Sequence, residues 1–163
     1  MIYVVFCMYC IPIGIIHTPH KDPKGTPIQP IGATEYEGVI ELEPKYVEGL
    51  KDLDGFSHII LLYQFHKSIH FNLRVKPYMD KEERGLFATR YPARPNPIGL
   101  SVVRLQKING NRLIIQDVDM LDGTPLLDIK PFIPDVDNRI TDRVGWLEGK
   151  ANRMSEKKSD GRI

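Results

Sequence analysis

Short apolar runs separated by polar turns recur along the chain. Residues 11–17 and 35–43 are typical of strands, and residues 126–133 form a last apolar segment after a turn. Residues 57–65 form a continuous run with many β-branched and aromatic side chains. Such a run suits a strand that is buried on both faces or that closes a barrel.

The clearest pairing signal surrounds Asn109-Gly110-Asn111. Residues 101–108 and 112–120 flank this turn, so we expect them to be antiparallel partners in a hairpin. Many short strands without helices between them argue against alternating strands and helices. The pattern therefore predicts a mainly all-β fold.

Prolines govern the segments between the strands. Four prolines in residues 17–34 exclude both a long helix and a central strand there. Pro44 offers a start for a short helix through Leu50, and residues 86–89 are expected to return to a strand. Three prolines in residues 87–101 then force an extended, rigid loop. Such a loop can hold arginine side chains still for an anionic ligand at a small ordering cost.

Composition indicates one domain with a tail. The 163 residues, 42% of them hydrophobic, can form one core but hardly two. We assign residues 1–10 to an N-terminal extension, 11–148 to the barrel domain and 149–163 to a mobile polar tail with too little apolar surface to become ordered. The formal charge of +1 gives no globally basic surface, so any RNA contact must be local.

The N-terminus predicts neither a membrane span nor a metal site. Residues 1–16 are apolar but shorter than a span and lack the basic start of a signal peptide, so we expect no membrane association and a cytoplasmic location. Cys7 and Cys10 form a C-x-x-C, followed by His17 and His20. The gap between these pairs is too short for a zinc finger of the usual kind, and no metal is predicted.

Four sequence blocks together carry a family resemblance. They are IGIIHTP at 13–19, LDGFSHI at 53–59, FATRYPARPNPIGLS at 87–101 and LDGTPLLDIKP at 121–131. In content and order these blocks resemble the TrmO (TsaA-like) family of tRNA methyltransferases, over roughly residues 12–137. The resemblance implies a small single-sheeted β-barrel with long proline-rich loops and a short helix. It also implies that the barrel binds S-adenosylmethionine and methylates the N6 nitrogen of threonylcarbamoyladenosine beside the tRNA anticodon.

The cofactor site implied by the resemblance is not a Rossmann site, because no G-x-G-x-x-G follows a strand. Phe65, Ile31 and Leu100 are suited to sandwiching an adenine ring, although core packing would explain Phe65 and Leu100 equally well. Arg90 is suited to a carboxylate, and Asp117 or Asp119 to an amino group or ribose. The full expected set is Gln29, Pro30, Ile31, Phe65, His66, Arg90, Leu100, Gln116, Asp117, Val118 and Asp119.

The substrate side of the site is expected on the second proline loop. Arg94 and Asn96 project from a loop in which a guanidinium has no internal bonding need, so we expect them to contact the threonine carboxylate or a tRNA phosphate. Asp122 is a further candidate, whose ordinary role would be to form a turn. His66 could serve as a general base, but we favour a binding role, and the sequence identifies no base.

Two other interpretations stay open: a module that senses S-adenosylmethionine without turnover, and an RNA-binding barrel without a cofactor. The expected partner is tRNA carrying threonylcarbamoyladenosine. A small barrel with one open edge could complete its site by dimerising, so we also expect a homodimer. Removal of residues 149–163 is expected to leave cofactor binding intact.

Overall fold

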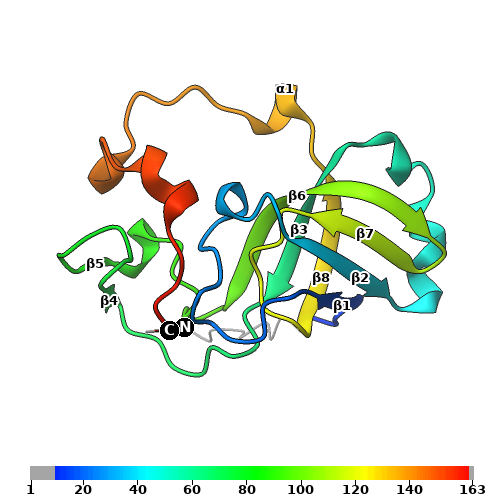
Figure 1. The fold of residues 1–163 in the computed structure, drawn as a ribbon, viewed down its shortest axis with the longest axis horizontal. Helices are drawn as coiled ribbons and strands as arrows, with labels where there is room; N and C mark the ends of the chain where they lie inside the picture. The colour runs from blue at the N-terminus through cyan, green and yellow to red at the C-terminus, as the bar shows by residue number, and fades with distance from the viewer. Residues whose placement is uncertain (1–9, 162–163) are drawn as a thin grey trace, which may run out of the picture.

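Six antiparallel strands close into a barrel in the computed structural model, which describes residues 10–161 (Figure 1). Around the barrel the order is β1-β2-β7-β6-β3-β8, and β8 pairs back with β1. The expected mainly all-β class and the single-sheeted barrel are confirmed. The strands are β1 (Gly14–His17), β2 (Glu37–Leu42), β3 (His58–Gln64), β6 (Ile98–Asn109), β7 (Arg112–Gln116) and β8 (Thr124–Pro131).

Closure of the sheet changes the argument for a dimer. Strand β3 lies between β6 and β8, and β1 lies between β2 and β8, so the barrel has no open edge among the described residues. Our expectation of a dimer rested on a free edge that a partner would cover. That premise is wrong, and the dimer itself stays a prediction.

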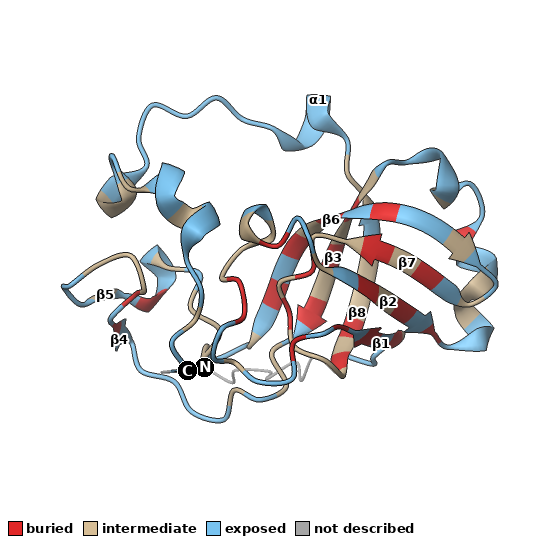
Figure 2. Ribbon diagram, viewed as in Figure 1, coloured by how far each residue is buried: buried red, intermediate tan, exposed pale blue. Residues whose placement is uncertain are grey.

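The core lies inside the barrel because alternate residues of each strand point inward (Figure 2). In β3, Ile59, Leu61 and Tyr63 are buried while the residues between them are partly exposed. Of our two interpretations of this run, the strand that helps close a barrel is the one observed. Leu113 and Ile115 of β7 add to the same core.

The expected hairpin is confirmed: β6 and β7 pair around Gly110, with Asn109 opposite Arg112. Gly110 has φ of +60°, a conformation that glycine adopts without the steric cost of a side chain. A register shift between Leu105 and Lys107 marks a bulge in β6.

The helical elements are short. The helix expected from Pro44 is present as a 3-10 helix, η2 (Pro44–Leu50), and prolines also start η1 (Pro30–Gly32) and α1 (Pro134–Asp137). The strand expected at residues 86–89 is wrong, because the segment forms the 3-10 turn η4 (Leu86–Ala88). The other elements are β4 (Arg74–Val75), β5 (Arg84–Gly85), η3 (Leu53–Gly55), η5 (Gly145–Leu147) and η6 (Ala151–Glu156).

The C-terminal segment returns across the molecule from α1 to the first proline loop (Figure 1). We name residues 145–159 the strap. Lys158 forms a bridge with Pro27, and backbone bonds of 2.8 Å join Ser159 to Gly25 and to Thr26. We expected a mobile tail in residues 149–163, but backbone pairing supplies partners that composition alone does not reveal. The N-terminal extension that we expected at residues 1–10 lies outside the described residues except for Cys10.

Among residues 10–161, no helix is long and apolar enough to cross a bilayer.

Candidate functional site

A cavity of about 810 Å³ lies between the barrel, the two proline loops and the strap. Its lining is mostly apolar and aromatic, with a few polar groups that converge on it, which is typical of a small-molecule site. The barrel side includes Tyr63, Phe65, Gly99, Leu100 and Asp119; the loops supply Pro27, Gln29, Arg90 and Arg94; the strap supplies Trp146, Leu147, Met154 and Ser159.

A chain of hydroxyl groups leads from the core to the carboxyl of Asp119. The Ser101 hydroxyl donates to Asp119 Oδ1 at 2.6 Å, and the Tyr63 hydroxyl lies 3.0 Å from Ser101 Oγ. Because the Ser101 proton is directed to Asp119, Tyr63 is the donor to Ser101. Tyr63 and Ser101 are almost fully buried, so this chain fixes one carboxylate oxygen rigidly.

The surroundings of Asp119 raise the pKa of its carboxyl into the range where it can exchange a proton. Burial raises the pKa of Asp119 to about 7, against the opposing effects of the Ser101 hydrogen bond and the positive charge of Arg90. Burial and the neighbouring Asp119 also raise the pKa of Tyr63, which therefore stays protonated at neutral pH. A carboxyl that titrates near pH 7 can take up or release a proton under physiological conditions.

The absence of a side chain at Gly99 gives the Tyr63 ring its place. The two residues are opposite each other on β3 and β6, and a Cβ at position 99 would lie 2.2 Å from Cε2 of Tyr63. The Tyr63 ring also meets Phe65 edge to face, with centroids 5.4 Å apart. This close approach keeps the tyrosine hydroxyl within reach of Ser101.

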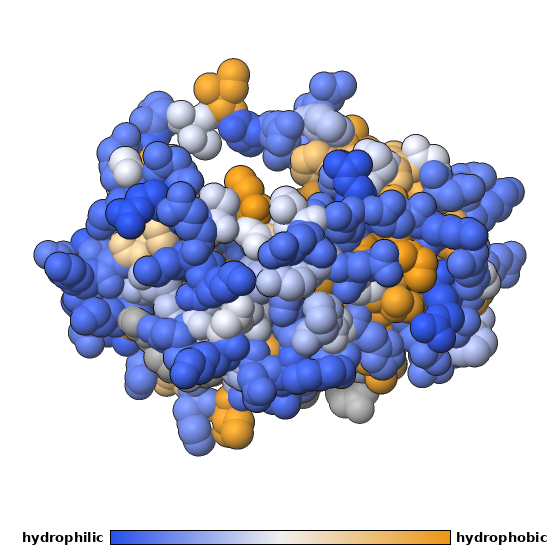
Figure 3. Space-filling model, viewed as in Figure 1, coloured by the Kyte–Doolittle hydropathy of each residue, from blue (hydrophilic) through white to orange (hydrophobic). Residues whose placement is uncertain are grey.

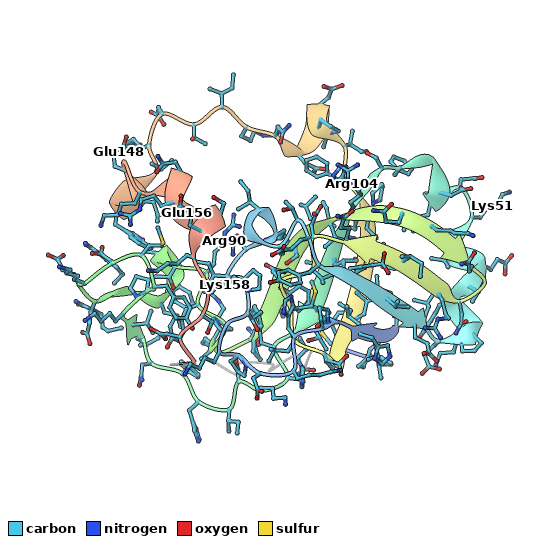
Figure 4. All side chains as sticks on the ribbon, in the orientation of Figure 1. Lys51, Arg90, Arg104, Glu148, Glu156 and Lys158 are labelled. Atoms are coloured by element: carbon cyan, nitrogen blue, oxygen red, sulfur yellow. The ribbon has the colours of Figure 1, made fainter. Side chains whose placement is uncertain are left out.

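Arg90 joins the two proline loops. Its Nη1 donates a 2.7 Å hydrogen bond to Oε1 of Gln29, the residue that precedes η1. Figure 4 labels Arg90 on the side of the barrel that faces the C-terminal segment. A guanidinium has five N–H donors, so Arg90 keeps donors for a carboxylate in the cavity.

Arg94 is bonded to its own loop, contrary to our expectation. Its Nη1 donates to the carbonyl oxygens of Thr89 at 2.9 Å and Tyr91 at 3.4 Å, and its guanidinium carbon lies 5.7 Å from the Phe87 ring centroid. The premise that the guanidinium has no internal bonding need is wrong. Arg94 still lines the cavity, and its contact with a substrate stays a prediction.

His66 follows the end of β3 and lies beside Thr124 of the fourth sequence block. Its Nδ1 is 3.5 Å from Thr124 Oγ1, while that hydroxyl donates a shorter bond of 2.7 Å to the Leu121 carbonyl. Burial, followed by the charge of Lys67, lowers the pKa of His66, so the imidazole is neutral at neutral pH. A neutral ring can both donate and accept a hydrogen bond.

The sequence matches the family described as the tRNA-methyltransferase O N-terminal domain over residues 15–138. The chain belongs to the TrmO family. It is 56% identical over 152 residues to a probable S-adenosyl-L-methionine-binding protein of Pyrococcus abyssi, a match that covers 93% of this chain and 83% of the relative. It is 37% identical over 134 residues to the mouse tRNA (adenine(37)-N6)-methyltransferase, with 78% of this chain and 31% of that protein covered.

The solved structure of TrmO from Pseudomonas aeruginosa has the same fold, with a TM-score of 0.74 at 39% identity. The match covers 86% of this chain and 62% of the solved one. This TrmO-family chain therefore spans less than two thirds of the length of its solved relative. The strap lies beyond residue 138, outside the matched family region, although it lines the cavity.

Within this TrmO-family cavity, the structure brings together some of the expected cofactor residues. Gln29, Phe65, His66, Arg90, Leu100 and Asp119 all line it. Pro30 and Ile31 do not, because they form η1 and the Ile31 side chain is 66% exposed.

Three residues expected near the cofactor have structural partners instead. Gln116 donates from its amide to the Thr34 carbonyl at 2.6 Å. Asp117 has φ of +72°, which turns the chain after β7, and the buried Val118 offers its carbonyl to His20. None of the three lines the cavity. The reversal at Asp117 is what carries Asp119 inward.

Two residues expected on the substrate side lie outside the cavity lining. Asn96 is exposed on the second proline loop. Asp122 accepts hydrogen bonds from the backbone N–H of Thr18 at 3.1 Å and from Lys21 Nζ at 2.6 Å. The hydrogen bond from Lys21 is the main cause that holds the pKa of Asp122 below its usual range. Through these two contacts the carboxylate links the start of the first proline loop to the turn before β8.

Sequence reasoning missed Tyr63, Ser101 and the strap residues. Ser101 ends the third sequence block, and Trp146 is the one tryptophan of the chain, placed in a polar segment. Those two facts were the available signals. No periodicity indicated that residues so distant in sequence would share a wall.

The histidines near the N-terminus are engaged in other contacts. His17 lies 3.6 Å from Asp122 and 3.9 Å from Glu41, and His20 contacts the Val118 carbonyl at 3.0 Å. Cys10 is exposed, and Cys7 lies outside the described residues. Within residues 10–161 no group of three histidine, cysteine or acidic side chains is arranged for a metal ion.

Proposed function

We propose that this protein binds S-adenosylmethionine in the cavity and methylates the N6 nitrogen of threonylcarbamoyladenosine beside the tRNA anticodon. The observation that carries the proposal is the meeting of Arg90 and Asp119 in one largely apolar cavity. The names of its relatives support it: one is a probable S-adenosyl-L-methionine-binding protein and another a tRNA (adenine(37)-N6)-methyltransferase.

The residues present fit such a cofactor. Phe65 and Leu100 offer apolar faces for an adenine ring, and 56% of the Leu100 side chain is still open to contact. Arg90 offers the fork geometry that a carboxylate requires, held in place by Gln29. Bound in this cavity, the cofactor would supply an electrophilic methyl group on a sulfonium.

Asp119 is suited to receive the proton that the attacking nitrogen loses. Its Oδ1 accepts the hydrogen bond from Ser101, and the residue lines the cavity, so we assign the proton to Oδ2. Oδ2 would take the N–H proton as the nitrogen gains the methyl group, and the departing sulfur would keep the electron pair of its bond to carbon. A pKa of about 7 keeps enough carboxylate for this role at neutral pH. Trp146 and Met154 of the strap line the cavity and would reduce the entry of water around a bound cofactor.

A sensor that binds the cofactor without turnover is the second candidate. Several relatives, including one from Archaeoglobus fulgidus that is 40% identical, are named for S-adenosyl-L-methionine binding and not for a reaction. Such a module would need the cavity but not a proton acceptor at Asp119.

Calorimetry with S-adenosylmethionine and its demethylated product tests the binding step. Labelled cofactor incubated with tRNA that carries or lacks threonylcarbamoyladenosine tests the reaction. We expect micromolar-order binding and labelling of modified tRNA alone. Binding without labelling of either tRNA would favour the sensor, and a folded protein that binds neither compound would exclude both candidates.

A further inference from the structure

Two aromatic side chains from distant parts of the chain line the same cavity. Phe87 belongs to η4 and Trp146 to the strap, and both line the cavity. The indole Nε1 of Trp146 donates a 2.7 Å hydrogen bond to the carbonyl of Ala88, the residue next to Phe87. This bond brings the indole to the phenylalanine loop.

Packing does not explain Phe87. Leu86, its neighbour in the same turn, is 1% exposed and anchors η4 in the interior, whereas Phe87 is 75% exposed. A large aromatic ring held in solvent by a rigid loop gains nothing for folding. Within residues 10–161, neither Phe87 nor Trp146 stacks on another aromatic ring, so both can accept one from a ligand.

Positive charges lie beside both rings. The Arg94 guanidinium carbon is 5.7 Å from the Phe87 centroid, and Lys150 Nζ is 6.0 Å from the Trp146 centroid. Lys150 also pairs with Asp80 at 3.4 Å. The strap as a whole carries four basic and two acidic side chains. Figure 3 shows the molecule hollowed between the segment that leads to the strap and the body.

Aromatic rings interleaved with cations are the usual platform for unpaired nucleobases, because each base offers a π face and its phosphate a negative charge. Enzymes that act on a base take it out of its stack and hold it between such rings.

We propose that Phe87 and Trp146 form a clamp that stacks an unpaired purine base of a single-stranded RNA loop at the mouth of the cavity. Arg94 and Lys150 attract the phosphates that flank this base. The inference rests on the proposed function, since the base would be the one whose nitrogen meets Asp119.

The single tryptophan gives a direct readout of the clamp. Stacking of a base on the indole should quench the tryptophan fluorescence, excited at a wavelength that tyrosine does not absorb, which reports on Trp146 alone. We would titrate the full chain with an RNA stem-loop carrying threonylcarbamoyladenosine, in the presence of saturating demethylated cofactor, and separately with that cofactor by itself. The expected result is quenching by the RNA and little change with the cofactor alone.

Three substitutions separate stacking from folding, with RNA affinity measured by the anisotropy of labelled RNA. Phe87→Leu and Trp146→Leu keep apolar volume but remove the π face, so each should weaken RNA binding about tenfold or more. Trp146→Phe keeps a ring without the Ala88 hydrogen bond and should lose less. Phe71→Leu is the matched control, because Phe71 is exposed but lies outside the cavity lining.

Each outcome bears on one proposal. Quenching by the cofactor alone, with none added by RNA, would place the cofactor in the clamp and overturn the inference. Methyl transfer with unchanged RNA affinity in both leucine variants would also overturn it, while the proposed function would stand. A protein that shows RNA quenching but binds no cofactor in calorimetry would keep the clamp and lose the proposed function.

Discussion

The hydroxyl of Ser101 and the carboxyl of Asp119 lie 2.6 Å apart, and this bond joins strand β6 to the segment that follows β7. Behind it the buried Tyr63 supplies the next hydroxyl. Placing an acid at the end of a buried polar chain costs stability unless the acid is neutral or well bonded. The barrel tolerates that cost in the wall of the cavity that Arg90 also lines, which is where a reactive carboxyl would be required.

The raised pKa of Asp119 predicts that the protein is less stable at pH 8 than at pH 5. The carboxyl has a model value of 3.8 and a folded value of about 7, so the folded state holds the proton more tightly. The stabilisation from this proton is complete below pH 4 and is lost as the pH rises through 7. For a partly accessible group we expect a loss of about 1–3 kcal/mol.

Denaturant unfolding of the wild type and of Asp119→Asn between pH 5 and pH 8 measures the effect. The asparagine variant has no proton to lose at this position, so its stability should change less across the range and exceed that of the wild type at pH 8. Parallel curves for the two proteins would refute the raised pKa.

Turnover should follow the same carboxyl. We expect Asp119→Asn to lower methyl transfer at least a hundredfold at pH 7, with affinity for the demethylated cofactor changed by only a few-fold. Ser101→Ala removes a hydrogen bond that lowers the pKa of Asp119, so the acidic limb of the rate profile should move to higher pH. If the profile of Ser101→Ala keeps its midpoint, another group takes the proton, and His66→Asn becomes the next variant to measure.

Gly99→Ala should destabilise the barrel by about 1–3 kcal/mol, because the new methyl group would overlap the Tyr63 ring. Displacement of the ring would also break the hydroxyl chain to Asp119. Thermal unfolding compares this variant with Gly49→Ala, a matched control at an exposed glycine with open space around its Cα. Equal melting temperatures for the two variants would show that the ring moves aside freely.

Much of the barrel was predictable because its signals are local. The continuous run of β-branched and aromatic residues at 57–65 and the Asn-Gly turn at 109–110 each specify an element within a few residues of sequence. The prediction for residues 86–89 was wrong because its local signal is only four residues long. In so short a run, the burial of Leu86 decides between a strand and a turn.

The site was predicted less well, because the direction of a side chain depends on backbone turns and on contacts between residues that are far apart in the sequence. Asp117 and Asp119 look alike in sequence, but a positive φ at Asp117 sends only Asp119 into the cavity. Arg94 was expected to reach outward, yet three nearby carbonyl oxygens of its own loop bind it. Trp146 reaches the cavity through a hydrogen bond to a residue 58 positions earlier, which no local pattern encodes.

The C-terminal segment is expected to contribute to cofactor binding, whereas its sequence predicted that removing it would leave binding intact. The deletion of residues 149–163 removes Met154 and Ser159 from the cavity wall, together with the backbone pairing that holds residues 25–28 beside Gln29. We therefore expect affinity for the demethylated cofactor to fall about 10- to 100-fold, which corresponds to roughly 1–3 kcal/mol of lost contact and loop order.

Gly32→Ala tests the same contact within the full chain, because a Cβ there would lie 2.7 Å from the Ser155 carbonyl oxygen and push η6 away. Both variants should keep the circular dichroism of the barrel, whose strands end before the strap begins. Hydrogen exchange in residues 25–28 should become faster in each. If calorimetry finds unchanged affinity in the deletion variant, the segment does not contribute to cofactor binding, as its composition first suggested.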